Sequence, residues 1–92
     1  LCSFLAQSQQ ILKGRLIAED TRLPVNAASI YLSNTSAGTI SKNDGSFQIH
    51  PFPNGRYDLV VSVLGFETYV IAVQSNKLPD FLEIVLKPKV ND

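Results

Sequence analysis

Residues 39–50, TISKNDGSFQIH, carry the residue types of a calcium-binding loop. Asparagine and aspartate directly precede Gly45, and oxygen ligands around a glycine are typical of an EF-hand. With Gly45 aligned to the glycine that this loop requires, Ile40 and Lys42 fall at the first and third ligand positions. Pro51 then stands where a bidentate glutamate belongs. The EF-hand interpretation therefore fails, and a looser site would have too few oxygen ligands.

The same residues are well suited to a tight turn. Asn, Asp and Gly tolerate the positive φ that a hairpin between right-twisted strands requires. The segment KNDG, residues 42–45, therefore predicts a hairpin turn between strands at residues 38–41 and 46–50.

His50 and Cys2 are the only histidine and the only cysteine. A histidine acting as general base needs a nucleophile and an orienting carboxylate, and neither stands at a recognisable spacing from His50. A zinc site needs three or four good ligands. We therefore expect no catalytic residue, no cofactor, no metal site and no enzyme activity.

Three aromatic residues form the candidate interaction surface. Tyr31 and Tyr69 are predicted to point outward from their strands, and Phe52 lies in the loop PFPNG. Such a surface could bind a carbohydrate or a peptide. Packing against a neighbouring domain explains the same residues equally well.

Composition limits the partners that the chain can have. Eight basic and eight acidic residues give a formal net charge of zero, and no basic stripe is visible. Nucleic-acid binding needs clustered Lys and Arg, so we expect none. With 92 residues, 45% of them hydrophobic, the chain is expected to fold as one globular domain.

Short apolar runs recur along the chain with turn residues between them, which is typical of a β-sandwich. In the first run Leu12, Gly14, Leu16 and Ala18 share one face, and Gly65 predicts a tight bend or bulge. The strongest strand starts at Arg56 and is expected to be central in its sheet. The predicted strands are residues 11–18, 27–33, 38–41, 46–50, 56–66, 66–73 and 81–87. We therefore predict an all-β, seven-stranded antiparallel sandwich.

The first eight residues resemble the end of a secretory signal peptide. They are apolar and uncharged and end in Ala6-Gln7-Ser8, with small residues where a signal peptidase reads. We therefore expect residues 1–8 to be a leader remnant, residues 10–88 the domain, and residues 89–92 a tail or the start of a linker. Export to the periplasm or the outer membrane follows from this interpretation, and Cys2 would be absent from the mature chain.

The ordered features of residues 11–87 resemble the carboxypeptidase regulatory-like domain family. The matching pieces are Gly14-Arg15-Leu16, Pro24 to Tyr31, Gly38-Thr39, Gly45-Ser46-Phe47, residues 53–57 and Gly65-Phe66. Ser41-Lys42 departs from the family's usual Thr-Asp. The resemblance implies a transthyretin-like (prealbumin-like) Greek-key sandwich.

The resemblance also implies a non-catalytic accessory module of exported or outer-membrane proteins, often preceding a TonB-dependent receptor barrel or a peptidase. Its partner would be another protein or a downstream domain of the same polypeptide, with only indirect membrane association. The alternative function is a small carbohydrate- or peptide-binding domain that acts through its loops or a sheet edge.

Overall fold

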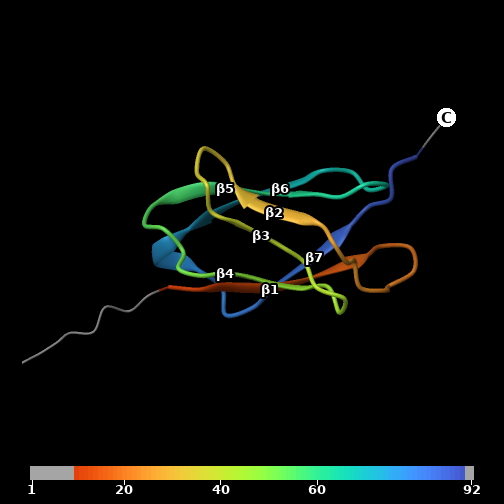
Figure 1. Ribbon diagram of the computed structural model, residues 1–92, viewed down its shortest axis with the longest axis horizontal. Helices are drawn as coiled ribbons and strands as arrows, with labels where there is room; N and C mark the ends of the chain where they lie inside the picture. Colours follow the sequence, from red (N-terminus) through yellow and green to blue (C-terminus); the bar gives the residue numbers. More distant parts are fainter. Residues whose placement is uncertain (1–9, 91–92) are drawn as a thin grey trace, which may run out of the picture.

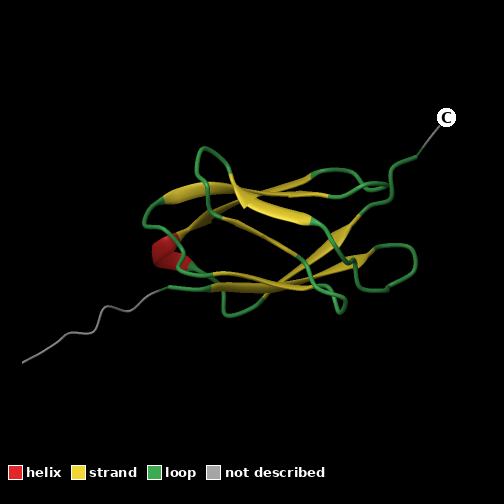
Figure 2. Ribbon diagram, in the orientation of Figure 1, coloured by secondary structure: helices red, strands yellow, loops and turns green. Residues whose placement is uncertain are grey.

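The computed structural model describes residues 10–90, which contain seven strands and one short 3-10 helix (Figures 1 and 2). The predicted leader, residues 1–8, and residues 91–92 of the predicted tail lie outside the described residues. The elements are β1 (Leu12–Ala18), β2 (Ser29–Leu32), β3 (Gly38–Ile40), β4 (Ser46–Ile49), β5 (Arg56–Ser62), β6 (Tyr69–Gln74), the 3-10 helix η1 (Ser75–Lys77) and β7 (Leu82–Leu86).

The strands form a two-layered sandwich, as predicted. One sheet has three strands in the order β4-β1-β7, and the other has four in the order β3-β2-β5-β6. Figure 1 views the two layers edge-on, with the four-stranded sheet above and the three-stranded sheet below. The prediction that the strand beginning at Arg56 is central is confirmed, because β5 lies between β2 and β6.

One strand pair departs from the predicted antiparallel pairing. β1 pairs with β7 in parallel, with Leu16 opposite Ile84, whereas every other pair in the two sheets of residues 10–90 is antiparallel. Short turns force neighbouring strands to be antiparallel, but β1 and β7 lie at opposite ends of the chain. The connection between them passes through the other sheet, so no turn restricts their relative direction.

The core fills the space between the sheets and follows the predicted alternation. Leu12, Gly14, Leu16 and Ala18 of β1 all face inward, as expected. The buried apolar side chains are Leu12, Leu16, Ala18, Val25, Ala28, Ile30, Leu32, Phe47, Ile49, Phe52, Leu59, Val61, Val73, Ile84 and Leu86. Both sheets contribute, so the apolar inner face of each sheet covers that of the other and shields it from water.

Residues 42–45 do form a tight turn, but its two strands do not pair as a hairpin. The Gly45 N–H donates to Lys42 O at 2.8 Å, and Gly45 has the expected positive φ of 80°. β3 belongs to the four-stranded sheet, however, and β4 belongs to the three-stranded one. The turn therefore carries the chain from one layer of the sandwich to the other.

Gly65 makes the tight bend predicted between β5 and β6. Its φ is 90°, and the Phe66 N–H donates to Val63 O at 3.2 Å across the bend. The last described residues close onto this bend, because the Lys89 N–H donates to Gly65 O at 2.8 Å.

Candidate interaction surface

Residues 10–90 bury a single polar side chain, that of Ser41. No group of three histidine, cysteine, aspartate or glutamate residues gathers there as a metal site would require. Every buried side-chain nitrogen or oxygen in this part of the chain has a hydrogen-bond partner. His50 is exposed at the end of β4.

No helix among the described residues is both long enough and apolar enough to cross a membrane.

Asp44, the carboxylate of the former calcium candidate, holds the turn together. Its Oδ1 accepts hydrogen bonds from the Ser46 N–H at 3.0 Å and from the Ser46 hydroxyl at 2.6 Å. The hydroxyl, and after it the backbone N–H, lowers the pKa of the Asp44 carboxyl below its ordinary value. This is an Asx-turn, in which a side-chain oxygen replaces a backbone acceptor. The role of Asp44 is therefore structural.

Ser41 is a residue whose importance the sequence analysis missed. It is 3% exposed, and it lies where the chain leaves the four-stranded sheet. Its hydroxyl donates to Val25 O at 2.8 Å and accepts from the Ala28 N–H at 2.9 Å. Ser41 thereby ties the segment before β2 to the end of β3. The sequence held one clue to this role. Ser41 stands where the family usually has threonine, and both side chains carry a hydroxyl.

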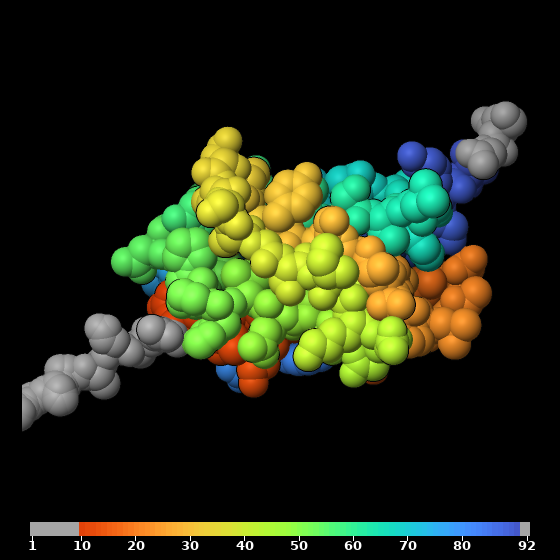
Figure 3. Space-filling view, viewed as in Figure 1, coloured from red at the N-terminus to blue at the C-terminus, as the bar shows by residue number. Residues whose placement is uncertain are grey.

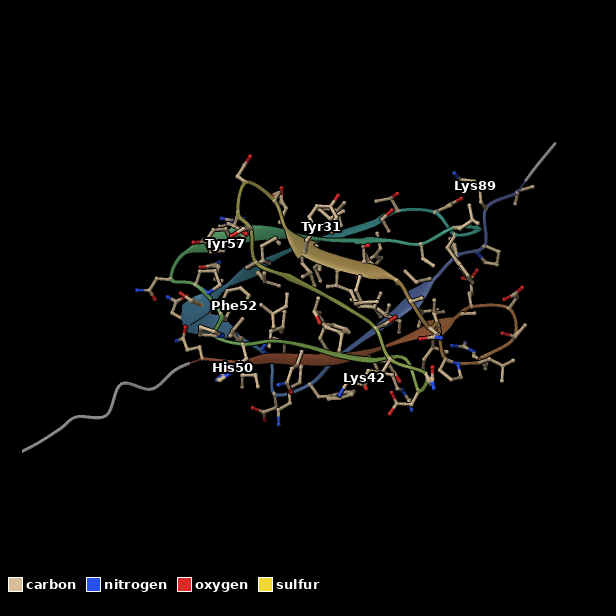
Figure 4. The ribbon with its side chains drawn as sticks, viewed as in Figure 1. Tyr31, Lys42, His50, Phe52, Tyr57 and Lys89 are labelled. Atoms are coloured by element: carbon tan, nitrogen blue, oxygen red, sulfur yellow. The ribbon has the colours of Figure 1, made fainter. Side chains whose placement is uncertain are left out.

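The three aromatic residues of the predicted interaction surface do not come together. Tyr31 points outward from β2 and is 42% exposed, as predicted. Figure 4 shows Tyr31 on the outer side of the four-stranded sheet and Phe52 between the two layers.

The prediction for Phe52 was wrong, because this side chain is only 4% exposed. The Phe52 N–H donates to Gln10 O at 2.7 Å, which folds the loop back toward the start of β1. The ring packs edge-on against Tyr57 with 6.0 Å between ring centroids. Strand alternation says nothing about a loop residue, so the sequence alone could not reveal this burial.

The outward orientation predicted for Tyr69 was also wrong. Tyr69 pairs with Val61, which is fully buried, and directly paired residues lie on the same face of a sheet. Tyr69 is therefore partly buried against the core. It also lines a hollow of about 220 Å³ with Val85 and the charged residues Glu19, Glu67 and Lys87.

The outer side of the four-stranded sheet presents an apolar surface that only the strand register reveals. Tyr31 pairs with Val60, and Val60 pairs with Val70, so these three side chains form a row across β2, β5 and β6. Tyr31 and Val70 are 42% and 56% exposed. Exposed Ile40 and Ala72 lie on the same side of the sheet, and the charged residues Arg56 and Asp58 border them at the start of β5. We name Tyr31, Ile40, Val60, Val70 and Ala72 the apolar face.

The outer side of the three-stranded sheet is more polar, although Ile17 pairs with the exposed Val85 on this side. Lys13 pairs with Gln48, and Arg15 pairs with Ser46 and Glu83. The Arg15 guanidinium lies 3.0 Å from the Glu83 carboxylate, and both side chains are about half exposed. An exposed ion pair of this kind contributes little stability, but it keeps this side of the sandwich hydrated. The two outer surfaces thus differ in chemistry.

A shallow groove of about 370 Å³ lies along one edge of the sandwich, where β3 and β4 approach each other. Residues of these two strands, yellow to light green in Figure 3, cover the edge that faces the viewer. Ile40, Phe81, Lys13 and Lys42 border the groove. All four are exposed, so the groove contains no buried polar group that would orient a small ligand.

Comparison with known families shows where this sandwich belongs. The family model for the CarboxypepD_reg-like domain matches residues 12–92. The chain belongs to this family. The CarboxypepD_reg-like match spans all seven strands, so the family assignment rests on the whole described sandwich and not on one motif. No curated protein matches the chain significantly.

Solved structures with the same fold include chains of two type II Cohesin-X-Dockerin complexes from Acetivibrio cellulolyticus. One, a C-terminal interface mutant, is 17% identical with a TM-score of 0.68 and covers 83% of this chain and 56% of its own. The other, an N-terminal interface mutant, is 16% identical with a TM-score of 0.70 and covers 85% and 57%. This CarboxypepD_reg-like domain therefore spans little more than half the length of those chains, and the likeness concerns the fold.

Proposed function

We propose that this domain is a non-catalytic protein-interaction module that docks a partner through the apolar face. The observation that carries the proposal is the difference between the two outer surfaces. One presents a row of Tyr31, Val60 and Val70 bordered by Arg56 and Asp58, while the other presents the Arg15–Glu83 ion pair and Lys13 with a single apolar pair, Ile17 and Val85. A contiguous exposed apolar patch with polar surroundings is typical of a docking site.

The chemistry of the apolar face favours a protein partner over a carbohydrate. Its members other than Tyr31 are aliphatic and lie on regular strands. Aliphatic side chains gain free energy by burial against another apolar surface, but they offer a sugar neither hydrogen bonds nor an aromatic platform. The alternative function required several aromatic residues on one surface, and Phe52 and Tyr69 are directed toward the core.

The partner is another protein or a further domain of the same polypeptide. The solved structures of similar fold come from complexes between proteins, which supports the use of such a sandwich in protein contacts. The accessory role of the family points the same way.

A charge placed on the apolar face should weaken docking without unfolding the domain. Tyr31→Lys puts an ammonium group at one end of the row, and burying an unpaired charge against a partner is unfavourable. We expect the complex in native extracts of the host to become smaller by size-exclusion chromatography. The apparent dissociation constant should rise by at least about tenfold.

Gln48→Lys is the matched control, because Gln48 is also exposed but lies on the polar side of the other sheet. This variant should leave the complex at its wild-type size. Equal weakening by both substitutions, or by Gln48→Lys alone, would exclude the apolar face as the docking site.

We also propose that the domain is exported and works in the periplasm or at the outer membrane, as an accessory module of a larger outer-membrane protein. The support lies in residues 1–8, whose uncharged, apolar character and Ala6-Gln7-Ser8 ending suit a signal peptidase. Fractionation of host cells should recover the protein outside the cytoplasm, with an N-terminus near Gln9 by mass spectrometry. A cytoplasmic protein that retains Cys2 would refute export.

A further inference from the structure

β6 is an exposed sheet edge without any charged residue. It forms one end of the four-stranded sheet, and its sequence, YVIAVQ, contains no Lys, Arg, Asp, Glu or Pro. Natural sheets usually protect their edges from other chains with charges, prolines or short strands. None of these devices is present in the six residues of β6.

The register of β5 and β6 determines which backbone groups are free. The Ser75 N–H donates to Gly55 O at 2.9 Å, and the following pairs run from Arg56 with Gln74 to Val61 with Tyr69. In an antiparallel ladder, hydrogen-bonded pairs alternate with non-bonded ones.

The backbone groups of Tyr69, Ile71 and Val73 therefore point toward β5. Those of Val70, Ala72 and Gln74 point to the open edge, where β6 has no neighbouring strand among the described residues.

From this geometry we propose that β6 pairs with β6 of a second copy of this chain. The two strands run antiparallel about a twofold axis at Ala72, and the two four-stranded sheets become one continuous sheet. Val70 of each copy then lies opposite Gln74 of the other, and the two Ala72 residues exchange their N–H···O bonds. This pairing does not depend on whether the apolar face binds a partner.

A second copy suits this edge because the twofold axis brings Ala72 opposite its own equivalent and pairs every other β6 residue with another residue of β6. A charged strand would then meet like charge, whereas β6 has none. The nearest charged side chain beside Ala72 is Asp58 on β5. Two Asp58 residues would lie three strand spacings apart, about 14 Å, which is beyond the Debye length of about 10 Å at 0.1 M salt.

The pairing also joins the apolar faces of the two copies. Arg56 pairs with Gln74, and Gln74 would lie beside Val70 of the second copy. The Tyr31–Val60–Val70 row of one copy would therefore meet Gln74 and Arg56 of the other, and the two apolar faces would join at the paired Ala72 residues.

The other sheet edges are less suited to self-pairing. β3 has three residues and ends where Ser41 directs the chain to the other sheet. β4 has four residues, and Pro51 follows closely after it. β7 carries Glu83, and Pro88 stands just beyond its end.

Sedimentation equilibrium and amide exchange of the 92-residue chain test this proposal together, at concentrations up to about 1 mM. We expect a reversible dimer. The Val70, Ala72 and Gln74 amides should become protected from exchange as concentration rises, whereas the Tyr69, Ile71 and Val73 amides should be protected at every concentration. The wild-type chain alone suffices for this measurement.

Ala72→Pro removes an N–H that points away from β5, so the monomer loses no ladder hydrogen bond. We expect this variant to fold and its dimer dissociation constant to rise more than about tenfold. Ala72→Ser keeps the N–H at the same exposed position and should dimerise like the wild type.

Three outcomes would overturn the proposal. One is a chain that stays monomeric throughout, and another is a dimer that Ala72→Pro leaves intact. The third is protection of the Val70, Ala72 and Gln74 amides only when an unrelated extended peptide is added. Because Tyr31→Lys does not touch the β6 edge, it should leave the dimer intact, so failure of the docking proposal and failure of this one are distinguishable.

Discussion

Replacement of Gly14 by alanine is expected to lower the free energy of unfolding by about 3 kcal/mol, at the upper end of overpacking effects. A Cβ at this position would overlap the carbonyl oxygen of Leu82 and lie 2.6 Å from Cζ of Phe47. Gly14 pairs with both residues, because β1 lies between β4 and β7. The Phe47 ring and the β7 backbone would have to move to make room for the Cβ, and this movement would disturb the packing of the core.

Gly65→Ala is the matched control for this effect. Gly65 has a φ of 90°, but a Cβ there would meet nothing within 4 Å. Its replacement should cost about 1 kcal/mol through backbone strain alone. Urea unfolding of both variants measures the difference. Equal losses of unfolding free energy would mean that the close contacts of Phe47 and β7 with Gly14 do not prevent a larger residue at position 14.

Ser41→Ala is expected to destabilise the domain by about 1–3 kcal/mol, although it removes a single oxygen atom. Ser41 is buried, and its hydroxyl bonds to both Val25 O and the Ala28 N–H. Without the hydroxyl, the Ala28 N–H loses its acceptor at a site with little access to water. The segment that leads into β2 then loses two hydrogen bonds to the end of β3.

Ser46→Ala offers a comparison, since this serine also uses its hydroxyl but in an exposed turn. Water can replace that hydrogen bond, so the loss should be below about 1 kcal/mol. Chemical unfolding at neutral pH compares the two variants. If Ser46→Ala proves the more harmful, the stabilising role assigned to the buried Ser41 hydroxyl is wrong.

Local pattern predicted much of this fold because alternation is a property of single strands. The inward face of β1 and the central place of β5 followed directly from the order of apolar residues. The bend at Gly65 and the turn at Gly45 followed from residues that tolerate positive φ. In each case the information lies within a few neighbouring residues.

Features that depend on contacts between distant segments were not readable in this way. The parallel pairing of β1 with β7 joins the two ends of the chain, and the layer change at Ser41 depends on Val25 and Ala28. Tyr69 was misplaced because its orientation follows from its pairing with Val61, which no local pattern shows.

The apolar face illustrates the same limit. Val60 lies on the outer side of its strand by simple alternation, but the row with Tyr31 and Val70 exists only through the register of three strands. Alternation within one strand can place each of these side chains on an outer side, but only the pairing of the strands brings them together.

Site-specific photo-crosslinking in the native host tests the docking proposal most directly. A photoreactive phenylalanine analogue at position 31 reports on the apolar face, and the same residue at position 48 reports on the polar side of the other sheet. We predict a covalent crosslink from position 31, either to one defined protein or to a further domain of the same polypeptide, and none from position 48. An adduct from position 48 alone, or none from either position, would contradict docking through the apolar face.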